Sequence, residues 1–111
     1  MKKIILMAIA FCISSNIFAA TFTGKVETIL LYDDGNIIYV YPKGGIPNPP
    51  SCHGSNGDYM TVLMNRSMAK EYLSALLAAM MAKKDVTFRI SDDCPEQSFA
   101  VKLNYFNVHS D

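Results

Sequence analysis

The sequence predicts one mainly β domain with a single helix, in the order three strands, a helix and two strands. The prediction depends on the short length of 111 residues, on segments in which apolar and polar side chains alternate, and on one segment with helical spacing. Half of the residues are apolar and the charges balance, which is typical of a folded chain rather than a disordered one. This length allows one domain and excludes a second.

The first 19 residues are predicted to be a secretory signal peptide, which leaves residues 20–111 as the mature domain. Lys2 and Lys3 precede an uncharged apolar stretch of about ten residues, and small residues lead to a cleavage position after Ala19. The stretch is shorter than the ~20 residues that cross a bilayer, and no second hydrophobic run follows it. We therefore expect a secreted or periplasmic protein without membrane insertion after processing.

A lipoprotein is the alternative interpretation of this leader, with Cys12 as the acylated residue. The bulky side chain of Phe11 precedes it, where lipoprotein processing favours a small residue. We therefore expect export without lipidation.

Export leaves Cys52 and Cys94 as the two remaining cysteines, and an oxidising compartment favours a disulfide between them. Closing a loop of about 43 residues disfavours the unfolded state by roughly 4 kcal/mol in the chain-entropy model. The alternative is a zinc site, in which His53 and His109 complete a Cys-His-Cys-His set. Neither a Cys-x-x-Cys nor a His-x-x-x-His pair is present, so we expect a disulfide and no metal.

Three strands are predicted before the helix. Residues 23–32 and 37–41 are rich in β-branched and aliphatic side chains, and the Asp-Asp-Gly-Asn sequence of residues 33–36 joins them as a hairpin. Residues 42–57 contain four prolines and several Gly, Ser and Asn residues, which predicts a long loop. Loops of this length are usually functional or tethered, and Cys52 tethers this one. The third strand follows over residues 58–64.

Residues 67–84 change to helical spacing. Apolar side chains cover most of the circumference, so we expect a largely buried helix that packs through its alanines against a sheet, with Leu76 in the core. Ser67 is the predicted N-cap, and Lys83 and Lys84 stand at the negative end of the helix dipole. The alternative is a helix whose methionine-rich face is exposed to a membrane or a partner.

Two strands are predicted after the helix. Residues 86–90 alternate between apolar and polar side chains, residues 91–96 turn the chain, and residues 99–108 form a long final strand. In that strand one face is expected to consist of Phe99, Val101, Leu103 and Tyr105.

This order of elements is that of the OB-fold, a five-stranded Greek-key barrel with its helix between the third and fourth strands. The predicted disulfide would then tie the loop before the third strand to the turn between the fourth and fifth. The alternative is a β-grasp-like or α+β meander, with one helix packed on an antiparallel sheet, because periodicity predicts element order better than strand pairing.

Several local features resemble known exported proteins. They are the leader, the opening strand Gly24-Lys25-Val26, the cysteine-bearing loop, the helix that runs directly into residues 86–90, and the cysteine that follows. In these features the chain resembles small secreted bacterial proteins and is distantly similar to the B subunit of subtilase cytotoxin. That resemblance implies an OB-fold, a homo-oligomeric ring of five subunits and binding of sialylated glycans. It assigns no sugar-contacting residue in this sequence.

The candidate binding residues lie on the long loop and on the strands beside it. They are Tyr41, Pro42, His53, Ser55, Asp58 and Tyr59. The preferred hypothesis is a non-enzymatic binding module for a glycan or protein, for which Tyr39, Tyr41 and Tyr59 offer stacking faces. The alternative is a structural or accessory envelope protein, and a third hypothesis is a hydrolase or inhibitor that acts through His53.

No cofactor and no catalytic residue is predicted. Ser55 near His53 is the one nucleophile with a nearby base, and it lacks a nucleophile-elbow pattern. The pairs Asp33-Asp34 and Asp92-Asp93 are expected to open turns rather than bind calcium. Without the leader, eight basic side chains remain against ten acidic ones, which disfavours a nucleic-acid partner.

Overall fold

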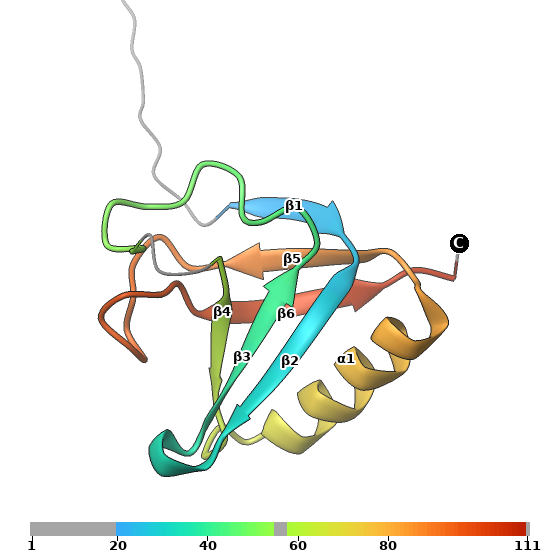
Figure 1. Ribbon diagram of the computed structural model, residues 1–111, viewed down its shortest axis with the longest axis horizontal. Coiled ribbons are helices and arrows are strands. Elements are labelled where there is room, and N and C mark those ends of the chain that lie inside the picture. The colour runs from blue at the N-terminus through green and yellow to red at the C-terminus, as the bar shows by residue number, and fades with distance from the viewer. Residues whose placement is uncertain (1–19, 55–57, 111) are drawn as a thin grey trace, which may run out of the picture.

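The computed structural model describes residues 20–54 and 58–110. They contain six strands in two three-stranded antiparallel sheets, with orders β1-β5-β6 and β2-β3-β4, and one α-helix (Figure 1). The elements are β1 (Thr21–Gly24), β2 (Val26–Tyr32), β3 (Ile37–Pro42), β4 (Met60–Leu63), α1 (Ala69–Ala82), β5 (Val86–Ile90) and β6 (Leu103–Val108). The predicted leader, with Cys12 and the cleavage position after Ala19, lies outside the described residues.

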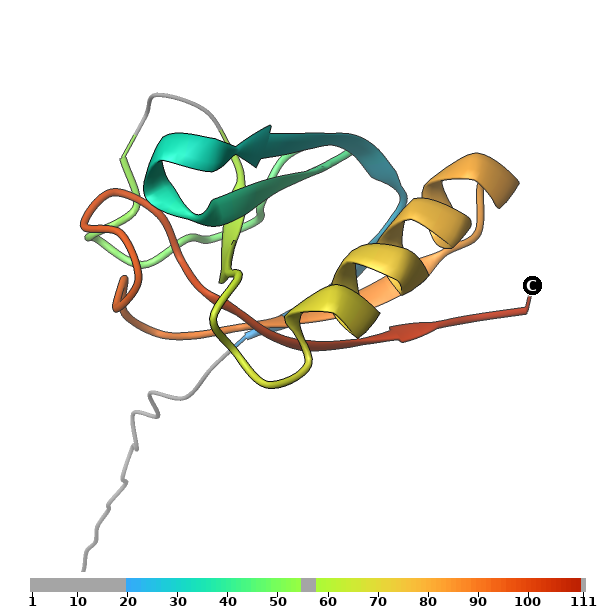
Figure 2. The same ribbon diagram turned by 90° about the horizontal axis from the view of Figure 1, so that it is seen from below.

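The prediction of a mainly β domain with one helix is confirmed, whereas the strand ladders do not close into a five-stranded barrel. Figure 2 shows the sheets as two layers, with α1 at one end and the long loops at the other. The layers meet where β4 approaches the segment before β6, at a parallel bridge between Thr61 and Lys102.

The predicted first strand, residues 23–32, is divided in two. β1 pairs with β5, and β2 pairs with β3 in the other sheet, so the chain changes sheets at Lys25. The carbonyl of Lys25 accepts a hydrogen bond from the N–H of Lys43 at 2.8 Å, and its ammonium group binds Asp85. Because the chain passes from one sheet to the other at Lys25, a single alternation of inward and outward side chains does not run through the whole segment.

The hairpin between β2 and β3 is confirmed. Residues 33–35 form a single 3₁₀ turn, after which Asn36 has a φ of 53° and donates its N–H to the carbonyl of Asp33 at 3.1 Å. Asparagine tolerates this left-handed conformation better than most residues, which explains its place in the turn. The third predicted strand is shorter than residues 58–64, since β4 covers only Met60–Leu63.

The helix differs from its prediction in its start and its burial. It begins at Ala69 after Met68, and neither Met68 nor Ser67 caps it with a side-chain hydrogen bond, so the predicted Ser67 N-cap is wrong. Leu76 is buried as expected, but Met81 is 77% exposed, so the prediction of a largely buried helix holds for one face only. No helix in the described part of the chain is long and apolar enough to span a membrane.

The final strand is also shorter than predicted, because β6 begins at Leu103. The register of β5 and β6 shifts between Arg89 and Ile90, and this bulge leaves Asn104 as an extra residue. The inward side therefore changes after Leu103, and Tyr105 becomes exposed where the alternation predicted it to share the face of Leu103.

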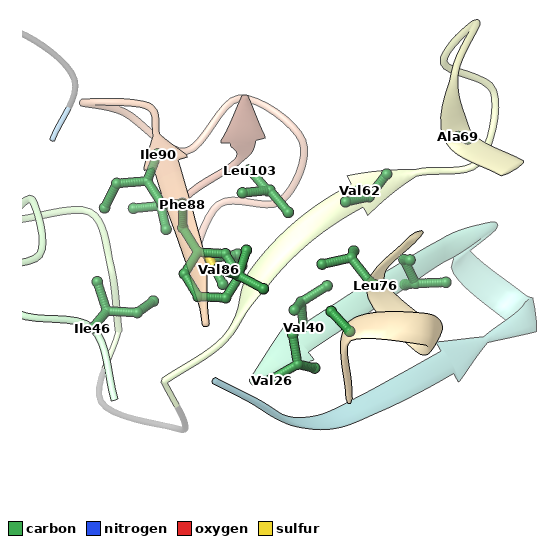
Figure 3. Packing of buried hydrophobic residues seen from close by; sticks show 14 residues of the cluster. Val26, Val40, Ile46, Val62, Ala69, Leu76, Val86, Phe88, Ile90 and Leu103 are labelled. Atoms are coloured by element: carbon green, nitrogen blue, oxygen red, sulfur yellow. The ribbon is translucent and has the colours of Figure 1, made fainter. Parts of the chain in front are cut away.

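The hydrophobic core lies between the two sheets. Phe88 and Ile90 of β5 face Val40 and Val62 of the other sheet, and Leu76 closes one end (Figure 3). The apolar side chains of β5 are almost fully buried, as their alternation predicts. The two sheets therefore turn their other faces away from this core.

Candidate functional site

The loop end is held by a disulfide between Cys52 and Cys94, as predicted. The sulfur atoms are 2.01 Å apart, and the bond joins the loop between β3 and β4 to the segment between β5 and β6. Both sulfurs are therefore unavailable as zinc ligands, and the described residues contain no group of three metal-ligating side chains. His109 lies elsewhere, with its Nε2 atom 2.7 Å from the hydroxyl of Thr87.

Tyrosines gather on the outer face of the β2-β3-β4 sheet. The ring centroids of Tyr39 and Tyr59 are 4.4 Å apart, and those of Tyr41 and Tyr59 are 5.3 Å apart. Tyr32 extends the group, with its ring 5.9 Å from that of Tyr39. We call these four residues, together with Gln97, the tyrosine face.

Gln97 covers the tyrosine face from the segment between β5 and β6. Its amide nitrogen donates to the hydroxyl of Tyr39 at 2.6 Å, and its amide oxygen accepts from Tyr59 at 3.3 Å. Burial, followed by the proximity of the other tyrosines, raises the pKa of Tyr39 above its usual value. The predicted stacking rings of Tyr39 and Tyr59 are thus buried, and Tyr41 remains half-buried.

Phe99 is the exposed aromatic side chain at the loop end. Its side chain is 62% exposed, while its carbonyl accepts the N–H of Gly54 at 2.7 Å. The next residue, Ala100, is fully buried against Tyr39 and Tyr59. Phe99 thus combines an exposed ring with a backbone that is hydrogen-bonded to Gly54 and followed by a buried residue.

His53 is buried beneath this surface, with its side chain 1% exposed. Its Nδ1 atom accepts a hydrogen bond from the N–H of Val101 at 3.3 Å, so Nδ1 carries no proton in this arrangement. Its Nε2 atom is also buried and makes no hydrogen bond within the described residues, and Asp58 Oδ1 lies 3.4 Å away. This geometry keeps the imidazole away from any substrate that stays in solvent.

Asp58 and Gly45 approach closely on the other side of the loop. Gly45 has a φ of 83°, and a Cβ atom placed there would lie 2.4 Å from the Asp58 carboxylate. Only glycine therefore fits at this position without displacing Asp58.

The predicted binding residues divide into three groups. Tyr41 and Tyr59 contact each other, and His53 and Asp58 contact each other. Pro42 is the buried last residue of β3, so the loop begins after Pro42 rather than at it. Ser55 lies outside the described residues.

A buried ion pair at the loop end was missed by the sequence prediction. Arg66 Nε lies 3.1 Å from the carboxylate of Glu96, and both side chains are largely buried. The same carboxylate accepts the hydroxyl of Thr61 at 2.9 Å and the N–H of Leu63 at 3.2 Å. Their sequence positions, before α1 and between two strands, gave no indication of this contact.

The sequence prediction missed the exposed position of Phe99 for a different reason. Phe99 was assigned to a strand because it continues the alternation of Val101 and Leu103, although an aromatic residue close to Pro95 and Ser98 is also compatible with a turn.

The outer face of the other sheet is polar. We define the threonine face as the outward side chains of β1, β5 and β6, namely Thr21, Thr23, Thr87, Arg89, Tyr105 and Asn107. The hydroxyls of Thr23 and Thr87 are 2.9 Å apart, and the guanidinium of Arg89 lies 5.9 Å from the ring centre of Tyr105.

Comparisons with protein-family models, with curated proteins and with solved structures gave no significant match to this chain. Functional conclusions about it therefore depend on its own geometry, in which the fixed and exposed ring of Phe99 beside the disulfide-held loop is the leading candidate for a binding site.

Proposed function

We propose that this chain is an exported, non-enzymatic binding module whose ligand packs on Phe99. The observation that carries the proposal is an exposed aromatic ring on a backbone held by Gly54 and by the buried Ala100. A site prepared in this way loses little conformational entropy when a ligand binds. The Cys52–Cys94 disulfide adds to this rigidity, because it joins the two segments that form the surface.

A glycan is the ligand class that we favour. A sugar ring has an apolar C–H face that packs on an aromatic ring, and hydroxyls at its edge that need polar partners. Phe99 supplies the aromatic ring, and the exposed Ser98 and half-buried Gln97 lie next to it in the chain. Burial of the His53 ring supports a binding role over hydrolysis, since a general base must reach the proton that it removes.

We also infer an OB-like arrangement of the strands. Lys25 alone separates β1 from β2, so one bent strand takes part in both sheets. The parallel bridge between Thr61 and Lys102 brings the third strand of the predicted order beside the fifth, and α1 lies between the third and fourth. A homo-oligomeric assembly belongs to the same proposal, and it comes from the sequence resemblance to subtilase cytotoxin B subunits. Sedimentation equilibrium of the mature protein tests the assembly, and a monomer at all concentrations would contradict it.

Export is part of the same proposal. The basic and apolar leader and the disulfide are both typical of proteins that mature outside the cytoplasm. Expression of the full chain in a Gram-negative host, followed by intact mass measurement of the recovered protein, should give a chain that begins at Ala20. A cytoplasmic full-length product, or an acyl group on Cys12, would contradict this prediction.

The binding proposal is tested on a glycan array with the mature protein and two variants. Phe99→Ala should reduce the binding of every recognised glycan by about tenfold or more, since exposed aromatic anchors dominate such contacts. Tyr105→Ala is the matched control, because it removes an aromatic ring that is 51% exposed on the threonine face. Equal loss in both variants would contradict the site, and an array without any binding would favour the structural envelope role.

A further inference from the structure

We propose that protonation of His53 controls the loop surface around Phe99. The neutral ring holds the backbone from Phe99 to Val101 in place at neutral pH, and the protonated ring releases it in mild acid. We call the contact between His53 and Val101 the latch. The inference rests on the binding surface proposed above and assigns its regulation. The buried ring accepts the N–H of Val101, and the neighbouring Gly54 donates its N–H to the carbonyl of Phe99. Two consecutive loop residues thus hold the backbone on both sides of Ala100.

The loop that carries His53 is itself fixed. The N–H of His53 binds the carbonyl of Pro50 at 3.0 Å, and Cys52 is covalently joined to Cys94. The backbone that carries the imidazole is therefore held in place on both sides of His53. Any change in the ring is transmitted to the segment that presents Phe99.

Protonation removes the contact with Val101. A neutral imidazole has one acceptor nitrogen, whereas an imidazolium has two donors and no acceptor. A proton on Nδ1 would point at the N–H of Val101, and turning the ring over would not restore an acceptor. The N–H of Val101 would then be left without its partner in a buried position, which is unfavourable.

Charged groups lie on both segments that hold the ring. Asp58, on the loop side, is the one carboxylate within 4.0 Å of an imidazole nitrogen among the described residues, and its side chain is about half exposed. On the opposite segment, Lys102 follows Val101, and Glu96 is already engaged by Arg66 and Thr61. The Asp58 carboxylate lies on the Nε2 side of the ring, so it cannot replace the acceptor that Val101 loses at Nδ1.

The direction of the pH effect follows from proton counting. The latched state needs a neutral His53 and therefore binds fewer protons than the released state. Its stability relative to the released state decreases as the pH falls through the range in which histidines change charge, about pH 5 to 8. For one coupled proton, the released fraction rises by up to about tenfold per pH unit.

Amide hydrogen exchange of the mature, disulfide-bonded protein measures the latch without any ligand. After correction for intrinsic exchange rates, protection of the Val101 and Gly54 amides should fall by about tenfold or more between pH 7.5 and pH 5.0. Protection of the core strand β5 should stay constant over this range. Unchanged protection at Val101 would overturn the proposal.

Two variants separate the latch from general acid sensitivity. His53→Asn places an oxygen acceptor near the position of Nδ1 and cannot titrate, so Val101 protection should become independent of pH. His109→Asn removes the other histidine and should behave as the wild type does. A pH response that persists in His53→Asn would contradict the latch.

A third measurement covers the case in which His53→Asn does not fold. In the wild-type protein, the NMR titration of the His53 ring and the change in Val101 protection should share one midpoint, and two separate midpoints would reject the latch. Since none of these readouts needs a ligand, their failure is distinguishable from a failure of the Phe99→Ala binding test.

Discussion

The outer faces of the two sheets come from similar alternating strands and have opposite environments. On the tyrosine face, Tyr39 and Tyr59 are buried and hydrogen-bonded through Gln97. On the threonine face, Thr23 and Arg89 meet solvent, and Tyr105 is exposed. The difference arises because the segment between β5 and β6 covers one face, whereas no described segment covers the other in this way.

This difference shows that the strands alone do not decide which residues belong to the core. Ala100, at the end of the segment that starts at Glu96, forms a second, smaller hydrophobic cluster with Ile37, Tyr39 and Tyr59. The segment is tied down by the disulfide and by the ion pair of Glu96 with Arg66. These tethers act on the segment that covers the tyrosine face, and neither of them involves a residue of the threonine face.

Among the substitutions that test this difference between the faces, removal of the disulfide should change the free energy of unfolding most. Replacing Cys52 and Cys94 together by alanine should lower the free energy of unfolding by about 4 kcal/mol, because the bond closes a long loop in the unfolded chain. Urea denaturation of the oxidised wild type and the double variant measures this change. A loss below about 1 kcal/mol would show that the tether is not needed to hold the covering segment.

The Glu96→Ala substitution should have the next largest effect. It leaves the Arg66 cation largely buried without its carboxylate, and it deprives Thr61 and Leu63 of an acceptor. Breaking a buried pair from one side typically costs about 3 kcal/mol or more. If urea denaturation showed no difference from wild type, the ion pair could not be what fastens the segment over the tyrosine face.

Removing one tyrosine hydroxyl from each face compares the two faces directly. Tyr39→Phe leaves the amide of Gln97 without an acceptor and should cost about 1 kcal/mol. Tyr105→Phe, on the threonine face, should change stability by less than about 0.5 kcal/mol, as is usual for exposed positions. Equal effects in thermal or urea denaturation would mean that the two faces are equally solvated.

The smallest effect is expected at the surface pair of Lys25 and Asp85, beside the threonine face. The hydrogen bond from Lys25, and then its charge, lowers the pKa of Asp85 below the usual value. The folded state therefore gains stability from Asp85 above its unfolded pKa of about 4, and it loses this gain as the pH falls through the lowered value.

Asp85→Asn should consequently cause a slight loss at pH 7 that disappears in high salt and at pH 2. Thermal denaturation at low and high salt measures this change. A loss that is insensitive to both salt and pH would point to packing rather than charge.

The sequence was sufficient to predict the place of the helix between two groups of strands, the disulfide and the inward face of β5, because each depends on local pattern or on the number of cysteines. It did not predict the division of the first strand between two sheets. It was not sufficient for the final strand, where the bulge at Asn104 exchanges the two faces. The burial of Tyr39 depends on a covering segment about 60 residues later in the chain, and Phe99 belongs to that segment. Contacts at such separation have no signal in the local pattern of a single sequence.

The pairing of β1 with β5 has a consequence for how the molecule assembles. Thr21 lies opposite Arg89, so the first strand of the domain has no partner in its own sheet until nearly the whole chain is present. Closing such a long-range contact is slow compared with forming the β2-β3 hairpin or α1. A nascent chain with this connectivity stays incompletely folded for most of its synthesis, which is the condition that a polypeptide needs to thread through a translocation pore.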